Sequence, residues 1–185
     1  MMNNIIEENG DLRIDFESGA VVMIAAVDDA MGLGRRGAIP WNVPSDRAFF
    51  RRQTMGAAVI VGRVTYESLP VGGDGRRGLD GRLCAVLSRR SVAAPGAGVV
   101  WGSDAGELLE RCRAARGVVY VAGGGMVYRA LLPQATDVLL SRIAGDWQCD
   151  VQFVAVGAPE WQLVAAWPMP GFVLQWWRKS AHDGV

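Results

Sequence analysis

The sequence lacks an excess of either charge, because 19 lysines and arginines stand against 19 aspartates and glutamates. A chain without a net field does not attract nucleic acid or an anionic membrane as a whole. Any anionic ligand must therefore be bound by a local group of cations. Half of the residues are hydrophobic, which excludes a disordered chain, and 185 residues suffice for one domain with a substantial core.

Cysteine is scarce, and its spacing suits neither a disulfide scaffold nor a zinc site. Cys84, Cys112 and Cys149 are far apart, odd in number and without CxxC spacing. This pattern favours a reducing compartment, and we interpret the three as core thiols with no metal bound. The N-terminus lacks the basic segment and apolar run of a signal peptide, and no other apolar run reaches the length of a membrane span. The sequence therefore predicts a soluble, cytoplasmic protein.

Apolar runs of strand length recur along the chain from residue 21. They are continuous rather than alternating, which indicates strands in a sheet that helices cover on both faces. The runs lie at 21–27, 57–62, 83–88, 98–101, 118–122 and 137–143. Helices are expected between them over 45–55, 64–69, 104–115 (with Ser103 as N-cap) and 125–132 (ending before Pro133). This order predicts an α/β fold on a mainly parallel sheet.

The two ends of the chain differ from this pattern. Residues 161–167 and 172–179 alternate and are joined by Pro and Gly, which predicts an antiparallel hairpin at the sheet edge. Five of the seven tryptophans follow residue 140, either because the hairpin packs on the core or because it forms a self-association surface. Residues 1–19 are polar and without a period. We expect an extension outside the main core over 1–19, a domain over 20–180 and a tail over 181–185.

Three turns carry residues that suit phosphate groups. Open parallel sheets bind ligands outside the carboxyl ends of their strands. At such ends lie a triple glycine (123–125), a cation and a hydroxyl after a glycine (62–65), and a serine with two arginines (88–90). Each alone is also typical of a tight turn, a capped helix or a solvated basic turn, and the Rossmann fingerprint is absent. Together the three turns indicate an extended ligand that bears phosphates.

One carboxylate, Asp46, shares a helix face with apolar residues. On a helix over 45–55, Asp46, Phe49, Phe50 and Gln53 fall at i, i+3, i+4 and i+7. A carboxylate in a first turn is commonly a cap or a partner of the helix dipole. A buried carboxylate needs a partner, and a ligand with two adjacent donors, such as an aminopyrimidine, would supply one. Both interpretations stay open at this point.

Several ordered motifs together resemble the dihydrofolate reductases over residues 21–179. They read "IAAVDDAMGLGRRGAIPWNVPSD", "VIVGRVTYESL", "GRLCAVLSR", "VAGGGMVY", "LLSRI" and "CDVQF". The resemblance implies a three-layer fold with a mostly parallel eight-stranded sheet and an antiparallel C-terminal strand. It also implies hydride transfer from NADPH to C6 of 7,8-dihydrofolate, with a proton reaching N5, to give 5,6,7,8-tetrahydrofolate for one-carbon metabolism. A monomer that binds antifolate inhibitors is expected.

The resemblance implies which residues form the substrate site. Asp46 would be the sole acidic group of the pterin pocket and would bond the 2-amino group and N3. Trp41 would hold an ordered water, and Ser141, where the family usually has Thr, would orient the carboxylate. The other expected substrate residues are Ile24, Ala25, Arg47, Phe50, Leu69 and Arg82, the last of these for the α-carboxylate of the glutamate tail.

An NADPH site is implied in the same way. Residues 32–39 resemble the mobile loop that closes over nicotinamide. Arg63 and Thr65 would take phosphate groups, Ser88 and Arg89 the 2′-phosphate, and residues 123–125 the pyrophosphate, with Gly123-Gly124 as a cis pair. The expected cofactor residues are Ala26, Leu33, Gly34, Ile39, Gly62, Arg63, Val64, Thr65, Leu87, Ser88, Arg89, Gly123, Gly124, Gly125, Met126, Val127 and Tyr128.

Two departures from the family pattern stand out. Val64 occupies a position where many members have a second cation. Arg47 follows the carboxylate where an apolar residue is usual; it either pairs with the glutamate of the substrate, which would reduce trimethoprim sensitivity, or extends into solvent. Two other functions remain as alternatives. One is the riboflavin-pathway pyrimidine reductase, which shares the fold but lacks "PWNVPSD", and the other is a non-catalytic nucleotide-binding module.

Overall fold

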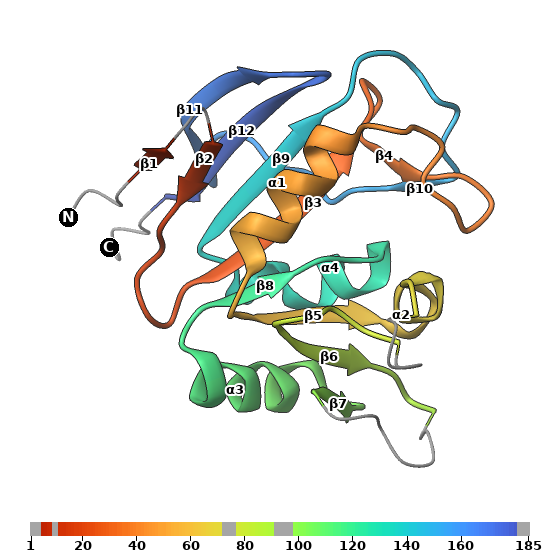
Figure 1. Ribbon diagram of the computed structural model, residues 1–185, viewed down its shortest axis with the longest axis vertical. Coiled ribbons are helices and arrows are strands. Elements are labelled where there is room, and N and C mark those ends of the chain that lie inside the picture. The colour runs from red at the N-terminus through yellow and green to blue at the C-terminus, as the bar shows by residue number, and fades with distance from the viewer. Residues whose placement is uncertain (1–4, 9–10, 72–76, 91–97, 181–185) are drawn as a thin grey trace.

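An eight-stranded sheet forms the centre of the computed structural model, which describes residues 5–8, 11–71, 77–90 and 98–180 (Figure 1). In spatial order the strands are β11 (Trp161–Met169), β12 (Phe172–Lys179), β9 (Asp137–Arg142), β3 (Val21–Val27), β8 (Val119–Val121), β5 (Ala58–Gly62), β6 (Leu83–Leu87) and β7 (Val99–Gly102). The strands from β9 to β7 pair in parallel, and β12 runs antiparallel to both of its neighbours. The predicted sheet and its edge hairpin are confirmed.

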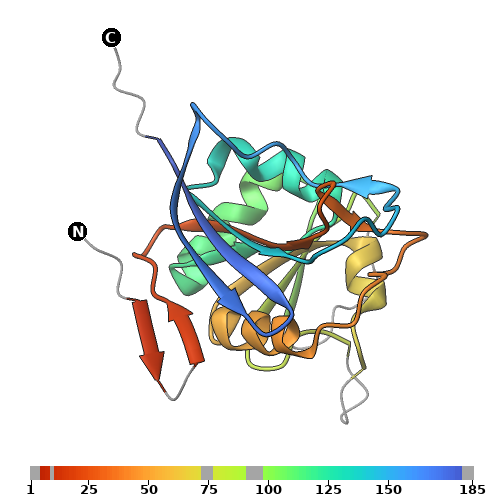
Figure 2. The same cartoon turned by 90° about the horizontal axis from the view of Figure 1, so that it is seen from above.

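Helices cover the sheet on both faces. They are α1 (Pro44–Thr54), α2 (Arg63–Ser68), α3 (Ala105–Arg116) and α4 (Gly125–Leu131), followed by the 3-10 turn η1 (Leu132–Gln134). On β3, Val21 and Met23 join the core cluster of α3 and α4, whereas Val22 and Ile24 join that of α1. Figure 2 shows α1 and the α3–α4 pair on opposite sides of the sheet. No helix in the described ranges is long and apolar enough to cross a membrane.

The helix boundaries agree with the sequence patterns to within about one residue, with two corrections. The N-cap of α3 is Asp104 rather than Ser103, because the Asp104 carboxylate accepts the Glu107 N–H at 2.8 Å. The segment expected as a helix over 125–132 ends at Leu131, and the chain continues through Pro133 as η1. A carboxylate one residue after Ser103 therefore decided where α3 begins.

The N-terminal segment does not lie outside the core as expected. It forms a hairpin of β1 (Ile5–Glu8) and β2 (Asp11–Ile14), and the side chains of Leu12 and Ile14 are buried in the cluster that includes α1. Ile14 donates its N–H to Gln53 Oε1 at 2.9 Å and accepts from Gln53 Nε2 at 2.6 Å. Alternation within β2 thus turns two apolar side chains inward. The predicted tail, 181–185, lies outside the described residues.

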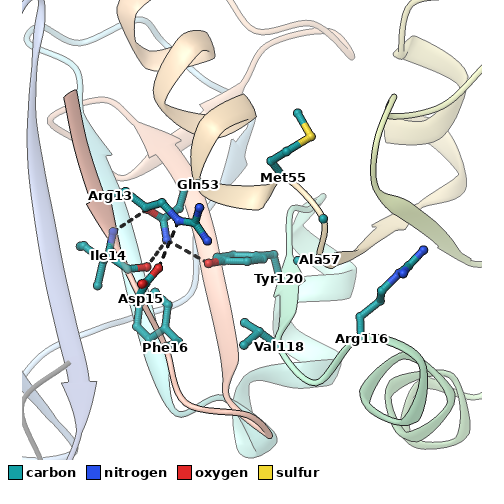
Figure 3. A pocket seen from close by; sticks show the side chains of 11 residues that line it. Arg13, Ile14, Asp15, Phe16, Gln53, Met55, Ala57, Arg116, Val118 and Tyr120 are labelled. Carbon is teal, nitrogen blue, oxygen red and sulfur yellow. Dashed lines mark hydrogen bonds and ion pairs between the residues drawn. The ribbon is translucent and has the colours of Figure 1, made fainter. Parts of the chain in front are cut away.

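A cavity of about 260 Å³ lies beneath this hairpin (Figure 3). Gln53 lies between the β2 backbone and Tyr120, whose hydroxyl accepts from Gln53 Nε2 at 2.9 Å. Arg13 and Arg116 are among the residues that line it, and Arg13 pairs with Asp15 at 3.1 Å. The cavity borders the C-terminal end of α1, so it is separate from the site around the first turn of that helix.

The three cysteines are free thiols. Cys84 and Cys112 are buried in the core as expected, and burial raises the pKa of each to about 11. Cys149 is half-buried, packs against the core cluster that includes α1, and lies beside Gly32 and Asp28. Burial and the neighbouring Asp28 raise its pKa, so none of the three is an activated thiolate.

Candidate active site

The first turn of α1 places Asp46 opposite the central strands. Pro44 occupies the first turn of α1, and the Ser45 hydroxyl donates to the Pro170 carbonyl, which fixes the start of the helix to the β11–β12 turn. Ser141 lies on β9, directly paired with Ala26 on β3. Three segments far apart in sequence, around 26, 46 and 141, therefore meet at one place.

The Asp46 carboxylate is half-buried and has one hydroxyl partner, Ser141. Burial raises its pKa, and the hydrogen bond with Ser141 and the charge of Arg47 lower it by less. The Tyr128 hydroxyl donates to the Ile24 carbonyl at 2.8 Å. Burial raises the pKa of Tyr128, and the nearby charge of Asp46 raises it further by a smaller amount. The structure thus brings Asp46 and Ser141 together, as the resemblance implied, in surroundings that favour the protonated acid.

The aromatic and aliphatic residues expected in the substrate site share the core cluster that includes Phe49 of α1. Trp41 is buried and packs edge-on against Trp147, with ring centroids 6.1 Å apart. Phe50 and Leu69 are half-buried and pack on the same core cluster as Trp41. Sequence reasoning missed Trp147, because it lies in a polar loop more than a hundred residues after Trp41. Its only signal was the concentration of tryptophan late in the chain.

The loop expected over nicotinamide is held by a small sheet that was not predicted. Within it, β4 (Gly32–Gly34) pairs antiparallel with β10 (Val151–Gln152). The Asp150 carboxylate accepts the Arg36 N–H at 2.8 Å, and the Asp150 N–H donates to the Gly34 carbonyl at 3.0 Å. Asp28 adds a second carboxylate that joins the two loops. Strands of two or three residues are too short to leave a periodic signal.

The three turns that suit phosphate lie side by side at the carboxyl ends of β5, β6 and β8, which are neighbours in the sheet. The Gly62 N–H donates to the Gly123 carbonyl at 2.7 Å, and a Cβ on Gly124 would lie 3.6 Å from Thr65 Oγ1. The Gly123-Gly124 peptide is cis, as the resemblance implied. Gly62 is paired with Leu87, the residue before Ser88, so the third turn is adjacent. No side chain in the described ranges caps the start of α2 or α4.

The family model of dihydrofolate reductase matches residues 20–170 of this chain. The chain belongs to the dihydrofolate reductase family. It is 34% identical over 143 residues to the dihydrofolate reductase of Neisseria meningitidis, covering 77% of this chain and 83% of the relative. It is 31% identical over 158 residues to dihydrofolate reductase type A13 from Escherichia coli, covering 85% and 91%.

The fold agrees with a solved dihydrofolate reductase. The enzyme from Enterococcus faecalis, complexed with NADP(H) and RAB-propyl, superposes with a TM-score of 0.77 at 25% identity, covering 88% of this chain and 98% of that one. Dihydrofolate reductases are NADPH-dependent oxidoreductases. The expected family and reaction class are therefore confirmed, whereas the roles of single residues stay predictions.

The expected site residues of this dihydrofolate reductase fall into three groups by exposure. The buried ones are Ile24, Ala25, Trp41, Arg82, Gly123, Gly125, Val127, Tyr128 and Ser141. The half-buried ones are Ala26, Leu33, Gly34, Asp46, Phe50, Gly62, Arg63, Thr65, Leu69, Leu87, Ser88 and Gly124. The exposed ones are Ile39, Arg47, Val64, Arg89 and Met126. Val127 and Tyr128 thus pack behind the glycine turn.

The cations of the phosphate turns differ in their partners. Arg63 Nη1 lies 2.6 and 2.7 Å from the two carboxylate oxygens of Glu67, one helical turn later. Arg89 is exposed, and Ser88 Oγ accepts from the Arg90 N–H at 3.1 Å. Val64 is exposed and uncharged, so Arg63 is the cation in the first turn of α2. A phosphate at Arg63 must therefore compete with Glu67 or share the guanidinium with it.

Proposed function

We propose that this family member reduces 7,8-dihydrofolate to 5,6,7,8-tetrahydrofolate with NADPH as reductant. The observation that carries the proposal is the Asp46 carboxylate, which contacts Ser141 and whose pKa is raised by burial. A carboxylate accepts two adjacent N–H donors, and the 2-amino group and N3 of the pterin present such a pair. The family match and the NADP(H) complex of the E. faecalis relative support this reaction.

The residues of this site would bind the substrate, orient it and remove bulk water from around it. Asp46 would hold the pterin by its donors, and Ser141 would keep the carboxylate in one orientation. Trp41, which is buried and packs on the exposed Trp147, would exclude bulk water on one side, and Phe50 would pack on the rings of the substrate. NADPH, when bound, supplies the hydride that C6 receives. Because its pKa is raised, Asp46 would be a better proton acceptor than an exposed carboxylate, in the pocket where N5 gains its proton.

The residues present fit NADPH along the edge formed by β5, β6 and β8. Glycines at 62 and 123–125 let two turns approach each other closely, since a Cβ on Gly62 would lie 3.1 Å from Val127 Cγ2. Thr65 and Arg63 would take phosphate oxygens, and Ser88 with Arg89 would take the 2′-phosphate. The Arg89→Gln variant should raise the KM for NADPH and leave that for NADH unchanged. Equal effects on both would contradict this role.

Dihydrofolate-dependent oxidation of NADPH, followed by absorbance, tests the central assignment. The Asp46→Asn variant should lose about 100-fold or more in kcat/KM at neutral pH, because the amide cannot accept both donors. Asp146→Asn is the control, since among the described residues Asp146 accepts only the Gln148 N–H, inside its own loop. Equal rates for wild type and Asp46→Asn would overturn the role of Asp46.

The alternatives are less well supported. A riboflavin-pathway reductase would share the fold, but the matching family model is that of dihydrofolate reductase. A non-catalytic module would have no need of a half-buried carboxylate with a hydroxyl partner. Assays with two substrates separate all three functions. A dihydrofolate reductase turns over dihydrofolate alone, a riboflavin-pathway reductase turns over a ribosylated aminopyrimidine alone, and a non-catalytic module turns over neither. The monomeric state and cytoplasmic location stay predictions from the sequence.

Arg47 supports a finer proposal, reduced sensitivity to trimethoprim. Its side chain is exposed, and its charge is close enough to lower the pKa of Asp46. A guanidinium here would pair with the glutamate of dihydrofolate, whereas trimethoprim has no carboxylate to gain from it. Arg47→Leu should raise the KM for dihydrofolate and lower the trimethoprim concentration needed for half-maximal inhibition. Arg47→Lys should change both values by less. Unchanged inhibition by trimethoprim in Arg47→Leu contradicts the proposal.

A further inference from the structure

The cavity beneath the β1–β2 hairpin lies where a segment outside the family match meets the matched domain. The family model matches residues 20–170, whereas β2 ends at Ile14. Residues 13–16 line the cavity together with residues 55–57, which follow α1, and residues around the start of β8. The proposed substrate site lies at the other end of α1. The cavity is therefore a separate place, and it depends on the hairpin of this chain.

Tyr120 lines this cavity and carries a buried donor that has no acceptor among the described residues (Figure 3). Tyr120 is only 4% exposed, and Gln53 Nε2 donates to its hydroxyl oxygen at 2.9 Å. The oxygen is thus the acceptor toward Gln53, and the O–H proton must point elsewhere. Burial raises the pKa of Tyr120 to about 12, so the hydroxyl keeps this proton at neutral pH. A ligand atom that accepts a hydrogen bond would satisfy the donor.

Two cations line the same cavity. Arg13 has one ion pair, from Nε to Asp15 Oδ1 at 3.1 Å, and no further hydrogen bond within the described ranges. Its charge is close enough to the Tyr120 hydroxyl to oppose the rise of that pKa. Arg116, in the last turn of α3, forms no salt bridge with any described carboxylate. Figure 3 shows the two arginines on either side of Tyr120, and with Asp15 as their counter-charge the cavity favours an anion.

The rest of the lining is apolar. It consists of Ile14, Phe16, Met55, Ala57 and Val118, apart from Gly56. A cavity of about 150 Å³ is enough to hold a benzene ring in a protein interior. This cavity has about 260 Å³, which leaves room for a charged group beside such a ring. The lining therefore suits a small ligand with one anionic end and one apolar end.

We propose that this cavity is a binding site for a small organic carboxylate whose apolar body is about the size of a benzene ring. The Tyr120 hydroxyl and the Arg13 guanidinium would bind the carboxylate. Met55, Ala57 and Val118 would contact the apolar body. The ligand would then contact β2, the end of α1 and the start of β8 together. Its binding should hold the hairpin on the domain and stabilise the fold.

Equilibrium titrations of the full-length protein, followed by NMR of the ligand, use benzoate as the probe. Benzamide has the same shape without the charge, and acetate has the charge without the ring. We expect benzoate to half-saturate the protein at about 1 mM, and both controls to bind at least about tenfold more weakly. Benzoate at about ten times that concentration should raise the thermal midpoint by about 3–6 °C. Absence of benzoate binding, or equal binding of either control, would overturn the inference.

Dihydrofolate separates this cavity from the proposed substrate site. In the absence of NADPH it is not reduced, so a saturating concentration keeps the substrate site filled. The half-saturating concentration of benzoate should then be unchanged. Displacement of benzoate by dihydrofolate would place the carboxylate in the substrate site and would overturn the inference.

Variants locate the bound carboxylate. Arg13→Gln and Tyr120→Phe should each weaken benzoate binding by about tenfold, because each removes a donor to the anion. The Arg13 side chain is 48% exposed, so its variant should fold even if the loss of the Gln53 acceptor unfolds Tyr120→Phe. Arg129→Gln is the matched control, because Arg129 is an exposed cation on α4 and its loss changes net charge equally. Wild-type affinity in Arg13→Gln, or an equal loss in Arg129→Gln, contradicts a site in this cavity.

Discussion

Asp28 Oδ2 accepts the backbone N–H of Trp147 at 3.1 Å across 119 residues of sequence. Its other oxygen accepts the N–H groups of Ala30 at 3.0 Å and Gly32 at 2.7 Å. The carboxylate is fully buried, and the Trp147 ring that it holds in place packs on Trp41. One side chain therefore joins the end of β3, the loop predicted to close over nicotinamide and the Trp41–Trp147 pair of the proposed substrate site.

We predict that Asp28→Asn destabilises the protein at neutral pH. An amide has a single acceptor oxygen, and its NH₂ group would face the N–H of Trp147 or Gly32. The loss of hydrogen bonds to a charged acceptor should lower the free energy of unfolding by about 2 kcal/mol, measured by urea denaturation. Asp146→Asn, whose contact stays inside one loop, should change it by less than about 0.5 kcal/mol. Similar losses in the two variants would contradict the bridging role of Asp28.

The cost of Asp28→Asn should depend on pH. Burial raises the pKa of Asp28, but the hydrogen bonds from Gly32, Trp147 and neighbouring groups together outweigh it, so the net shift is downward. A lowered folded pKa stabilises the fold above the ordinary carboxyl pKa of about 4, and this contribution is lost as pH falls through the folded value. The difference between wild type and variant should shrink in acid. A difference that is constant from neutral to strongly acidic pH contradicts the charge-based explanation.

The parts of the structure that the sequence predicts are those set by interactions between residues close together in the chain. The central strands were predictable because each apolar run is local, and the pairing of Asp46 with Ser141 came through the family motifs. Gln53 shows the limit: its spacing placed it on the apolar face of α1, but its partners are the Ile14 backbone and the Tyr120 hydroxyl. Contacts between segments 39 or 67 residues apart leave no periodic signal. The same holds for Asp28 and Trp147.

Gln53→Leu should destabilise the fold more than its similar volume suggests. The leucine would leave the N–H and C=O of Ile14 unpaired in a buried place and remove the donor to Tyr120. Each unpaired buried group costs about 1–3 kcal/mol, so we expect a loss of about 3 kcal/mol by urea denaturation. Gln134→Leu, at an exposed position of η1, is the control and should be nearly neutral. A small loss in Gln53→Leu would show that the N-terminal hairpin is held by its apolar side chains alone.

Asp46→Asn should make the protein more stable at neutral pH while it loses activity. Burial raises the pKa of Asp46 above its unfolded value, so the folded state binds the proton more tightly and is penalised as pH rises through this window. The neutral amide avoids the penalty. Its thermal midpoint should exceed that of wild type at neutral pH, and the gain should vanish below about pH 4, where both states are protonated. A lower midpoint in the variant at neutral pH contradicts this explanation and would indicate that Ser141 and Arg47 outweigh burial.

Gly32 and Cys149 fit each other in size, which a double-mutant cycle can measure. A Cβ on Gly32 would lie 2.4 Å from Cys149 Cβ and 2.9 Å from Asp28 Oδ1, so Gly32→Ala forces the two loops apart. We expect it to cost about 2–3 kcal/mol of unfolding free energy, with a higher KM for NADPH because the same loop is predicted to close over nicotinamide.

In the Cys149→Gly background the alanine should cost less than half as much, since the two atoms nearest to the added Cβ, Cys149 Cβ and Sγ, are removed. Gly157→Ala is the matched control, because no atom lies within 4 Å of its added Cβ. Equal costs of Gly32→Ala in both backgrounds would mean that the strain arises at Asp28 and not at Cys149. The coupling energy of the cycle therefore separates steric fit between the loops from disturbance of the carboxylate that joins them.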